Sequence, residues 1–292
     1  MDTLHQRKFI IALREKAKIG PKAFQRLLLS FGSVENIFGA SKNELCNVPR
    51  ISAEKAEQII ESGEEIDEIE SYIQRLEKEG TSICTILEED YPHILTQIND
   101  PPLLLYSKGE FPLRNKKFVA VVGTHHATEE GIKNAVQIGK DLARKEVVVV
   151  SGLARGVDSS AHLGAITNGG KTYAVLGNGF NLIYPPENLS LSEEITKNGA
   201  IISEYGPDVR VNIGQLMARN RIVVGLSQAV IMVEMEEGSI GTEDAILRAV
   251  EQGKPLFVCQ KDGNPNADFL IKEGAIPISG EEDLDLVLNY MF

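Results

Sequence analysis

The chain has 292 residues, of which 42% are hydrophobic and 25% charged, with three cysteines and no tryptophan. This ordinary globular composition excludes a disordered chain, a collagen and a coiled-coil array, and it leaves room for one large domain and a small one. The formal charge of −12, from 30 basic and 42 acidic side chains, argues against a nucleic-acid partner at first, because such proteins usually carry a basic surface.

The acidic excess is concentrated at one end of the chain. Residues 226–292 hold 4 basic and 13 acidic side chains, whereas residues 109–225 hold 13 basic and 11 acidic ones. Charged patches separated by more than the Debye length of about 8–10 Å present separate potentials to a ligand. A nucleic-acid partner therefore stays open if the middle of the chain forms the contact.

Neither secretion nor a membrane is indicated. The segment Met1 to Arg14 has no long apolar core with a cleavage site, and no run approaches the roughly 20 apolar residues that span a bilayer. Cys46, Cys84 and Cys259 lie far apart without a CxxC motif or a nearby histidine, so we interpret them as small core residues. We expect a cytoplasmic protein without a metal, a cofactor or a membrane partner.

Residues 1–70 are predicted to form a small all-helical domain. Apolar residues recur at helical spacing, and the segment 19–21 supplies a turn with Pro21 at the first helical position. Ser33 and Ser41 are candidate N-caps, and the segment 48–52 forms a turn before a helix from residue 53. Two helix pairs of this kind are similar to helix-hairpin-helix units, whose amides contact DNA phosphates. A packing or protein-interaction module is the alternative. An acidic helix over 61–79 is expected to follow.

Residues 71–292 are predicted to form an α/β domain. Several of its apolar, β-branched runs are continuous rather than alternating, which indicates strands buried on both faces of a mainly parallel sheet. Helical periodicity between the runs, with Ile132, Val136, Ile138 and Leu142 in one helix, completes the pattern. We predict an extended Rossmann-like, doubly wound fold. The predicted strands are 81–87, 103–107, 118–122, 147–150, 172–176, 200–203, 229–234, 255–259 and 275–278.

Ligands of such sheets bind beyond the carboxyl ends of the strands, so the loops there are the candidate sites. The loop 123–131 has small residues and hydroxyls that suit an anion at a helix N-terminus. The loop 151–158 offers two glycines, the Ser151 hydroxyl and the Arg155 guanidinium to a phosphate. A tight turn with a surface arginine is the alternative for the second loop. Asp158 and His162, four residues apart, are expected to share a structural hydrogen bond.

Two further loops carry weaker signals. The segment 177–182 has a GxG pattern, but Leu182 stands where a dinucleotide fingerprint needs a small residue. The segment 217–222, interpreted as a loop leading into a helix, places Arg219 and Arg221 on either side of Asn220. A phosphate or carboxylate ligand explains this cluster, and an arginine paired with an internal acid is the alternative.

No catalytic set accompanies these anion-binding elements. Glu204 and Glu234 follow strands without a neighbouring acid–base partner in the sequence, and no nucleophile lies in an elbow motif. The adjacent His125 and His126 lack a third metal ligand nearby. We therefore do not expect an enzyme.

Five ordered motifs resemble the DNA-processing protein A (DprA/Smf) family. The segment 151–162 matches the family's SGLARGxDxxAH signature, and the segment 219–227 carries RNRIxxGLS. The other matching segments are 90–106, 119–131 and 171–185. The helical start is similar to the family's sterile-alpha-motif-like (SAM-like) module.

The resemblance implies a homodimeric single-stranded DNA-binding protein that protects incoming DNA and loads the RecA recombinase during natural transformation. It also implies which residues line the DNA-binding crevice, with Arg155 and Lys171 as the main phosphate contacts. These residues are Gly123, Thr124, His125, Thr128, Ser151, Gly152, Arg155, Gly156, Lys171, Arg219, Asn220 and Arg221.

The chain also departs from the family pattern. His125 stands where the family usually has arginine, and the stretch 234–242 is shorter than its usual counterpart. Because family partners bind the last part of the sheet domain, the acidic end with Phe269, Leu270 and Ile271 is the candidate dimer or recombinase surface. Plain core residues are the alternative there.

A nucleotide-binding sensor or a phosphoribohydrolase-like enzyme on the same fold is the alternative function. The segment 238–242 is similar to the GGxGTxxE loop of such enzymes, but Ala245 occupies the position of the catalytic glutamate. A pure protein-interaction adaptor would leave Arg155, Lys171 and Arg219 without a ligand.

Overall fold

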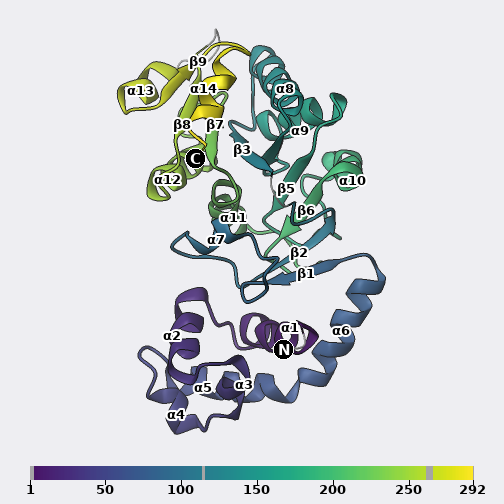
Figure 1. The fold of residues 1–292 in the computed structure, drawn as a ribbon, viewed down its shortest axis with the longest axis vertical. Coiled ribbons are helices and arrows are strands. Elements are labelled where there is room, and N and C mark those ends of the chain that lie inside the picture. Colours follow the sequence, from purple (N-terminus) through teal and green to yellow (C-terminus); the bar gives the residue numbers. More distant parts are fainter. Residues whose placement is uncertain (1–2, 114–115, 261–265, 292) are drawn as a thin grey trace. The chain divides into compact units, whose positions relative to one another are not determined.

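The computed structural model describes residues 3–113, 116–260 and 266–291, and the chain packs as two compact units (Figure 1). The first unit spans Met1–Tyr91 and Asp100–Tyr106, and the second spans Pro92–Asn99 and Ser107–Phe292.

The helices of the first unit are short and begin at capping residues. The side chains of Ser33, Ser41 and Ser52 accept hydrogen bonds from main-chain N–H groups at the starts of α3, α4 and α5, and Pro21 opens α2. The predicted helical domain and its caps are confirmed. The bounds are α1 (Thr3–Ile11), the π-helical turn η1 (Ala12–Lys16), α2 (Pro21–Phe31), α3 (Val34–Gly39), α4 (Lys42–Cys46), α5 (Ala53–Glu64) and α6 (Ile66–Lys78).

This compact unit extends beyond its helices. It includes β1 (Ser82–Thr85) and the first residues of β2 (Leu104–Gly109). The guanidinium of Arg7 donates to the carboxylate of Glu88 at 3.1 and 2.8 Å, and the Tyr106 hydroxyl donates to Glu15 at 2.6 Å. These contacts tie residues after position 70 to the helical module.

The second unit is built on a parallel sheet of seven strands, in the order β6-β5-β4-β3-β7-β8-β9. The strands are β3 (Lys117–Val122), β4 (Val147–Ser151), β5 (Thr172–Leu176), β6 (Ala200–Ser203), β7 (Ala229–Met232), β8 (Leu256–Cys259) and β9 (Ile276–Ile278). Within β3 to β8 almost every side chain is buried, as expected for a sheet covered on both faces. The predicted doubly wound α/β fold is confirmed.

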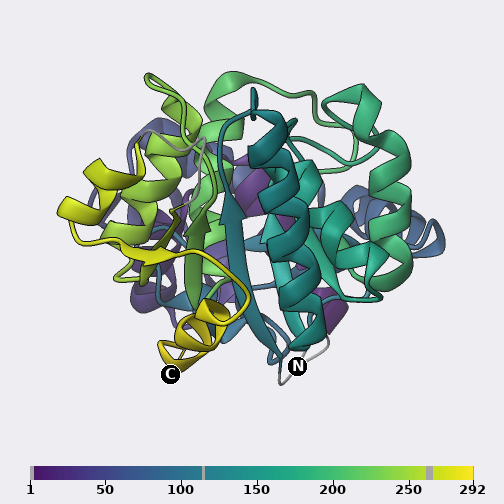
Figure 2. The ribbon, with the colours of Figure 1, turned by 90° about the horizontal axis from the view of Figure 1, so that it is seen from above.

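The order in which strands are added to the sheet reverses at β3. The chain runs outward through β4, β5 and β6 and then returns to β7 on the other side of β3, which makes a topological switch point. Because crossovers are right-handed, this reversal places α8 and α9, which lie side by side (Figures 1 and 2), on one face and α11 and α12 on the other. The helices are α7 (His93–Thr96), α8 (Glu129–Arg144), α9 (Val157–Thr167), α10 (Leu189–Asn198), α11 (Ile213–Gly225), α12 (Ile240–Glu251), α13 (Ala267–Lys272) and α14 (Asp283–Asn289), with a 3-10 turn, η2 (Pro186–Asn188).

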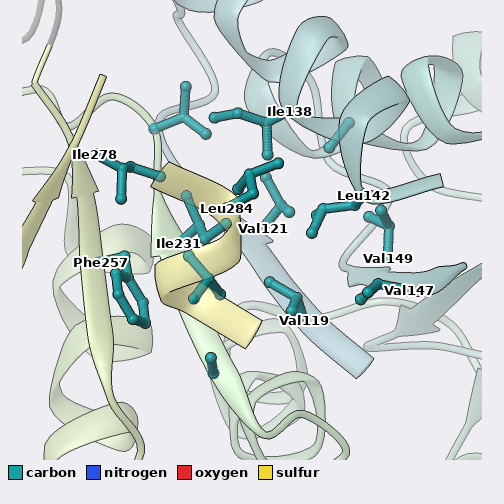
Figure 3. Close-up of a cluster of buried hydrophobic side chains, with 14 of the residues drawn as sticks. Val119, Val121, Ile138, Leu142, Val147, Val149, Ile231, Phe257, Ile278 and Leu284 are labelled. Carbon is teal, nitrogen blue, oxygen red and sulfur yellow. The ribbon is translucent and has the colours of Figure 1, made fainter. Parts of the chain in front are cut away.

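One cluster of buried apolar side chains packs α8 against its face of the sheet (Figure 3). Val119 and Val121 of β3 point toward Ile138 and Leu142 of α8, and Leu284 of α14 closes the cluster. The alternate β3 residue Val122 lines a cavity together with Val223 of α11. Successive side chains of β3 point to opposite faces of the sheet, so the same strand contributes to the apolar core on one face and to the cavity on the other.

Three sequence interpretations are wrong in detail. Ile132 is 41% exposed, because α8 buries small residues such as Ala135 and Gly139 against α9 instead. Cys46 is exposed, whereas Cys84 and Cys259 are buried as expected. The predicted acidic helix is two helices, since α5 continues to Glu64 before α6 begins. Within the described residues, no helix is long and apolar enough to cross a membrane.

Candidate nucleic-acid interface

A cavity of about 210 Å3 lies at the carboxyl edge of the sheet, at the switch point. Residues from the predicted loops after β3 and β4, among them Gly123, His125, Gly152 and Arg155, line this cavity. The other walls come from the segment 184–185, from α11 and from the start of α12. This is where doubly wound sheets bind their ligands.

The anion site at the N-terminus of α8 is filled from within the protein. The carboxylate of Glu234, 6% exposed, accepts the main-chain N–H of Thr128 at 3.0 Å and its hydroxyl at 3.1 Å. A Cβ atom on Gly131 would lie 1.6 Å from Glu234 Oε2, so glycine is needed for this approach. Thr128 also caps α8 by accepting the Gly131 N–H. The expected anion site at the start of α8 is therefore corrected, because a protein carboxylate already occupies the positive end of this helix.

The second loop shows the same arrangement. The buried Asp158 carboxylate accepts the N–H groups of Gly152 at 3.1 Å and Ala154 at 3.4 Å. The Ser151 hydroxyl is fully buried and donates to the Val121 carbonyl at 2.6 Å. The turn's amides and its hydroxyl are thus used for folding, which corrects the expectation that Ser151 reaches a ligand.

The glycines of this loop allow close packing against the first loop. Gly156 has φ +69°, and a Cβ there would lie 2.4 Å from the Thr124 carbonyl oxygen. That carbonyl accepts the Val157 N–H at 3.3 Å, and the Thr124 side chain is buried. Gly156 therefore locks the two loops together and serves the site through its backbone.

Two basic side chains reach the rim of the cavity. His125 is exposed and lines it, and Arg155 lines it while pairing with the exposed Glu187. The half-exposed Tyr184 lines the same rim. An exposed ion pair of this kind contributes little to stability because water screens it, so a phosphate can replace Glu187 as the partner of Arg155.

The cluster of Arg219, Asn220 and Arg221 lies inside α11 rather than in a loop. Arg219 and Asn220 line the cavity, and the Arg219 guanidinium is buried and donates to the Val175 carbonyl at 2.8 Å. Burial lowers the pKa of Arg219. The Asn220 amide donates to Gly241 and Asp244 at 3.1 and 3.0 Å, which ties α11 to α12.

Arg221 is directed elsewhere. Its Nη2 atom donates to both carboxylate oxygens of Glu204, at 2.9 and 2.8 Å, and both residues are buried. Successive residues of a helix point about 100° apart, so Arg219 and Arg221 cannot both face one cavity. The expectation that Arg221 lines the crevice is corrected, and the internal acid considered as the alternative is Glu204.

Lys171 lies at the opposite edge of the sheet. It precedes β5 and pairs with Glu110, and it lines a separate hollow with Lys116 and Val147, the first residue of β4. The five residues of β5 span about 16 Å at roughly 3.3 Å per residue. The expected position of Lys171 in the crevice is therefore wrong.

The expected bond between Asp158 and His162 is also absent from the bonds of the described residues. The fully buried His162 shares a 2.6 Å hydrogen bond with the Thr172 hydroxyl, which in turn donates to the Val149 carbonyl at 2.8 Å. The Nδ1 atom of His162 is therefore the donor. Burial lowers the pKa of His162 to about 3, and the nearby Arg219 charge adds to this effect.

The described residues contain no group of three or more potential metal ligands. Ala245 lines the cavity at the position where phosphoribohydrolase-like enzymes carry glutamate. At the other end of the unit, Phe269 is 59% exposed, Leu270 is buried and Ile271 is half-buried. Only Phe269 of this trio presents a large apolar side chain to solvent.

Comparison with protein families decides the relationship. A family model described as DNA recombination-mediator protein A matches residues 82–288, and one described as a SAM-like helix-hairpin-helix tandem matches residues 13–63. The chain belongs to the DNA recombination-mediator protein A family. The resemblance of its motifs to the DprA/Smf family is thereby confirmed.

Known members of the family are similar over most of the chain. The DNA processing protein DprA of Streptococcus pneumoniae is 38% identical over 206 residues, which cover 68% of this chain and 72% of that protein. Its Bacillus subtilis counterpart is 34% identical, with 75% and 77% covered. Protein Smf of Synechocystis is 33% identical, but the match covers only 58% of that protein against 78% of this chain.

Two solved structures share the fold. The X-ray structure of DNA processing protein A from Streptococcus pneumoniae matches with a TM-score of 0.81 at 29% identity and covers 98% of both chains. A structure of DNA processing protein A from Helicobacter pylori, described in terms of its single-stranded DNA binding mode, matches with a TM-score of 0.65 at 29% identity. It covers 73% of this chain and 97% of that one.

Proposed function

We propose that this chain binds single-stranded DNA at the cavity between the β3 and β4 loops, protects incoming DNA and loads a RecA-type recombinase during natural transformation. The observation that carries the proposal is the position of Arg155 and His125 on the rim of this cavity, in a fold shared with the Helicobacter pylori protein described as binding single-stranded DNA.

The rim offers the two kinds of contact that single strands use. Arg155 can leave its weak ion pair with Glu187 and bind a backbone phosphate instead. The ring of Tyr184, 42% exposed, is available for stacking with a base. The carboxylates of Glu234 and Asp158 hold the loops through hydrogen bonds to main-chain amides, and the proposed function is binding without catalysis.

The proposed partners include a second copy of the chain. Phe269 is an exposed aromatic residue on α13, in the acidic final part of the chain, and we propose it as part of a dimer or recombinase contact. Sedimentation of a Phe269→Asp variant tests this role, since a dimer that needs Phe269 dissociates and an unaffected mass contradicts it.

The experiment for the DNA-binding function measures the affinity for oligo-dT of increasing length and for dTMP, at two salt concentrations. We expect affinity that rises with length and falls with salt. Affinity for dTMP equal to that for long oligomers would favour the nucleotide sensor instead. RecA filament formation on DNA coated with a single-strand-binding protein, with and without this chain, tests the loading role.

A further inference from the structure

Arg155, the cation proposed to bind a backbone phosphate, is already paired with a carboxylate of the same chain. Its Nε atom donates to Glu187, and both side chains are about half exposed, at 52% and 49%. The carboxylates of Asp158 and Glu234, by contrast, are buried and accept main-chain N–H groups. Glu187 thus differs from them, because its side-chain partner is the group that a phosphate of the strand would use.

The turn that carries Glu187 is attached to the loop that carries Arg155. Glu187 is the middle residue of η2, and the segment 185–186 before it consists of two prolines, whose rings fix their φ angles. The next residue, Asn188, donates its side-chain amide to the Leu153 carbonyl, in the same loop as Arg155, at 2.8 Å. The turn and the loop therefore hold the carboxylate beside the guanidinium in the free protein.

The carboxylate of Glu187 interferes with phosphate binding in either of two ways. Its own main-chain N–H and the Arg155 guanidinium lower the pKa of this carboxyl group, so it is charged at neutral pH. A phosphate that uses the Nε atom of Arg155 must displace Glu187 from it. A phosphate that uses the terminal nitrogen atoms instead lies close to a second negative charge. Both arrangements make binding weaker than it would be at an unpaired arginine.

We propose that Glu187 is an internal counterion that competes with the phosphates of single-stranded DNA for Arg155 and so limits the affinity of this chain. This inference rests on the proposed binding of single-stranded DNA at Arg155. Because salt also screens the exposed pair of Arg155 and Glu187, the competition is strongest at low salt. The affinity of the wild type is therefore less sensitive to salt than it would be without the charge of Glu187.

The first test compares the oligo-dT affinities of the wild type, Glu187→Gln and Glu194→Gln at two salt concentrations. Glutamine keeps the size of the side chain and removes its charge, and we expect Glu187→Gln to bind about two- to five-fold more tightly at the lower salt. Its log affinity should also fall more steeply with log salt. Glu194, 52% exposed and paired with Lys197 on α10, is the matched control, because Glu194→Gln removes the same charge without freeing Arg155. Equal affinities of the two variants overturn the proposal.

The second test repeats the comparison in an Arg155→Ala background, which separates competition for Arg155 from general charge repulsion. The gain from Glu187→Gln should shrink there toward that from Glu194→Gln, because the cation for which Glu187 competes is absent. A gain as large as in the wild-type background overturns the internal counterion. If the wild type binds oligo-dT with length dependence and Glu187→Gln brings no gain, only the counterion is overturned. If the wild type shows no length-dependent binding, the proposed DNA-binding function fails and the counterion fails with it.

Discussion

Several charged side chains that the sequence placed at the site bond to other groups of the protein instead of facing a ligand. Glu234 reaches Thr128 across 106 positions of the sequence, and Glu204 pairs with Arg221 across 17. The sequence shows which loops are rich in cations and hydroxyls. It does not show which distant residues will pair with them, because the packing of separate elements determines those pairs. This is why the sequence indicated more anion-binding groups than the folded protein leaves free.

His125 stands where the family usually has arginine, and this difference should lower the affinity for single-stranded DNA. An arginine guanidinium is permanently charged and offers a fork of N–H donors that matches a phosphate, so His125→Arg should bind oligo-dT more tightly. Binding isotherms at fixed salt and neutral pH give the comparison, and equal affinities would contradict the role of position 125 as a phosphate contact.

The pair of Glu204 and Arg221 should matter for stability rather than for DNA. Glu204→Leu alone removes the carboxylate that balances the buried Arg221 charge and should lower the free energy of unfolding by about 3–5 kcal/mol. The double variant Glu204→Leu with Arg221→Met should recover much of that loss, because no buried charge remains. Urea unfolding measures both, and a single variant as stable as the wild type would contradict a structural pair.

His162 should make the protein less stable in acid. Burial holds the pKa of His162 at about 3 in the folded chain, below its ordinary value of 6.5. The unfolded chain therefore binds the extra proton first, and stability falls as the pH drops from about 6.5 toward 3. At pH 5 the loss from this residue is about 2 kcal/mol. A His162→Gln variant should show a smaller drop in urea midpoint between pH 7 and pH 5, whereas an identical drop would contradict the buried neutral ring.

Among the elements, the strands were predictable and one helix start was not. Continuous apolar runs identified the strands because both faces of the sheet are covered. The start of α11 was missed, although Asn212 and Gln215 form a capping box that the sequence displays as N-x-x-Q. The apolar periodicity of α8 did not reveal its contact with α9, since that contact is made by a residue without a side chain, Gly139, which lies against the Ala161 carbonyl.

The contact between the first two loops depends on a single glycine. Gly156→Ala would place a methyl group 2.4 Å from the Thr124 carbonyl at a positive φ, and left-handed geometry alone costs about 1–2 kcal/mol. We expect a lower melting temperature and weaker oligo-dT binding. Gly169→Ala, also at positive φ but with open space around its Cβ, is the control and should weaken stability without affecting DNA affinity. Equal effects of both variants on DNA affinity would contradict a loop-specific role.

The formal charge of −12 combines an acidic final segment with a slightly basic middle, and the two segments meet at the cavity. A carboxylate oxygen of Glu236 lies 3.2 Å from His126 Nδ1, and the start of α12 lines the cavity wall. Arg155 and Lys171, in contrast, line two different hollows on either side of the sheet. The motif match assigned both cations to one crevice, although the predicted strand 172–176 already placed Lys171 before its first residue. Its place before β5, rather than after it, decides the edge.

The most direct measurement is the salt dependence of oligo-dT affinity for the wild type, Arg155→Ala and Lys171→Ala. Each phosphate contact on a single strand contributes about 0.7 to the slope of log affinity against log salt. Arg155→Ala should therefore bind more weakly, with a slope shallower by about 0.7, while Lys171→Ala keeps the wild-type slope. A wild-type slope for Arg155→Ala, or a loss only with Lys171→Ala, would contradict DNA binding at the carboxyl edge of the sheet.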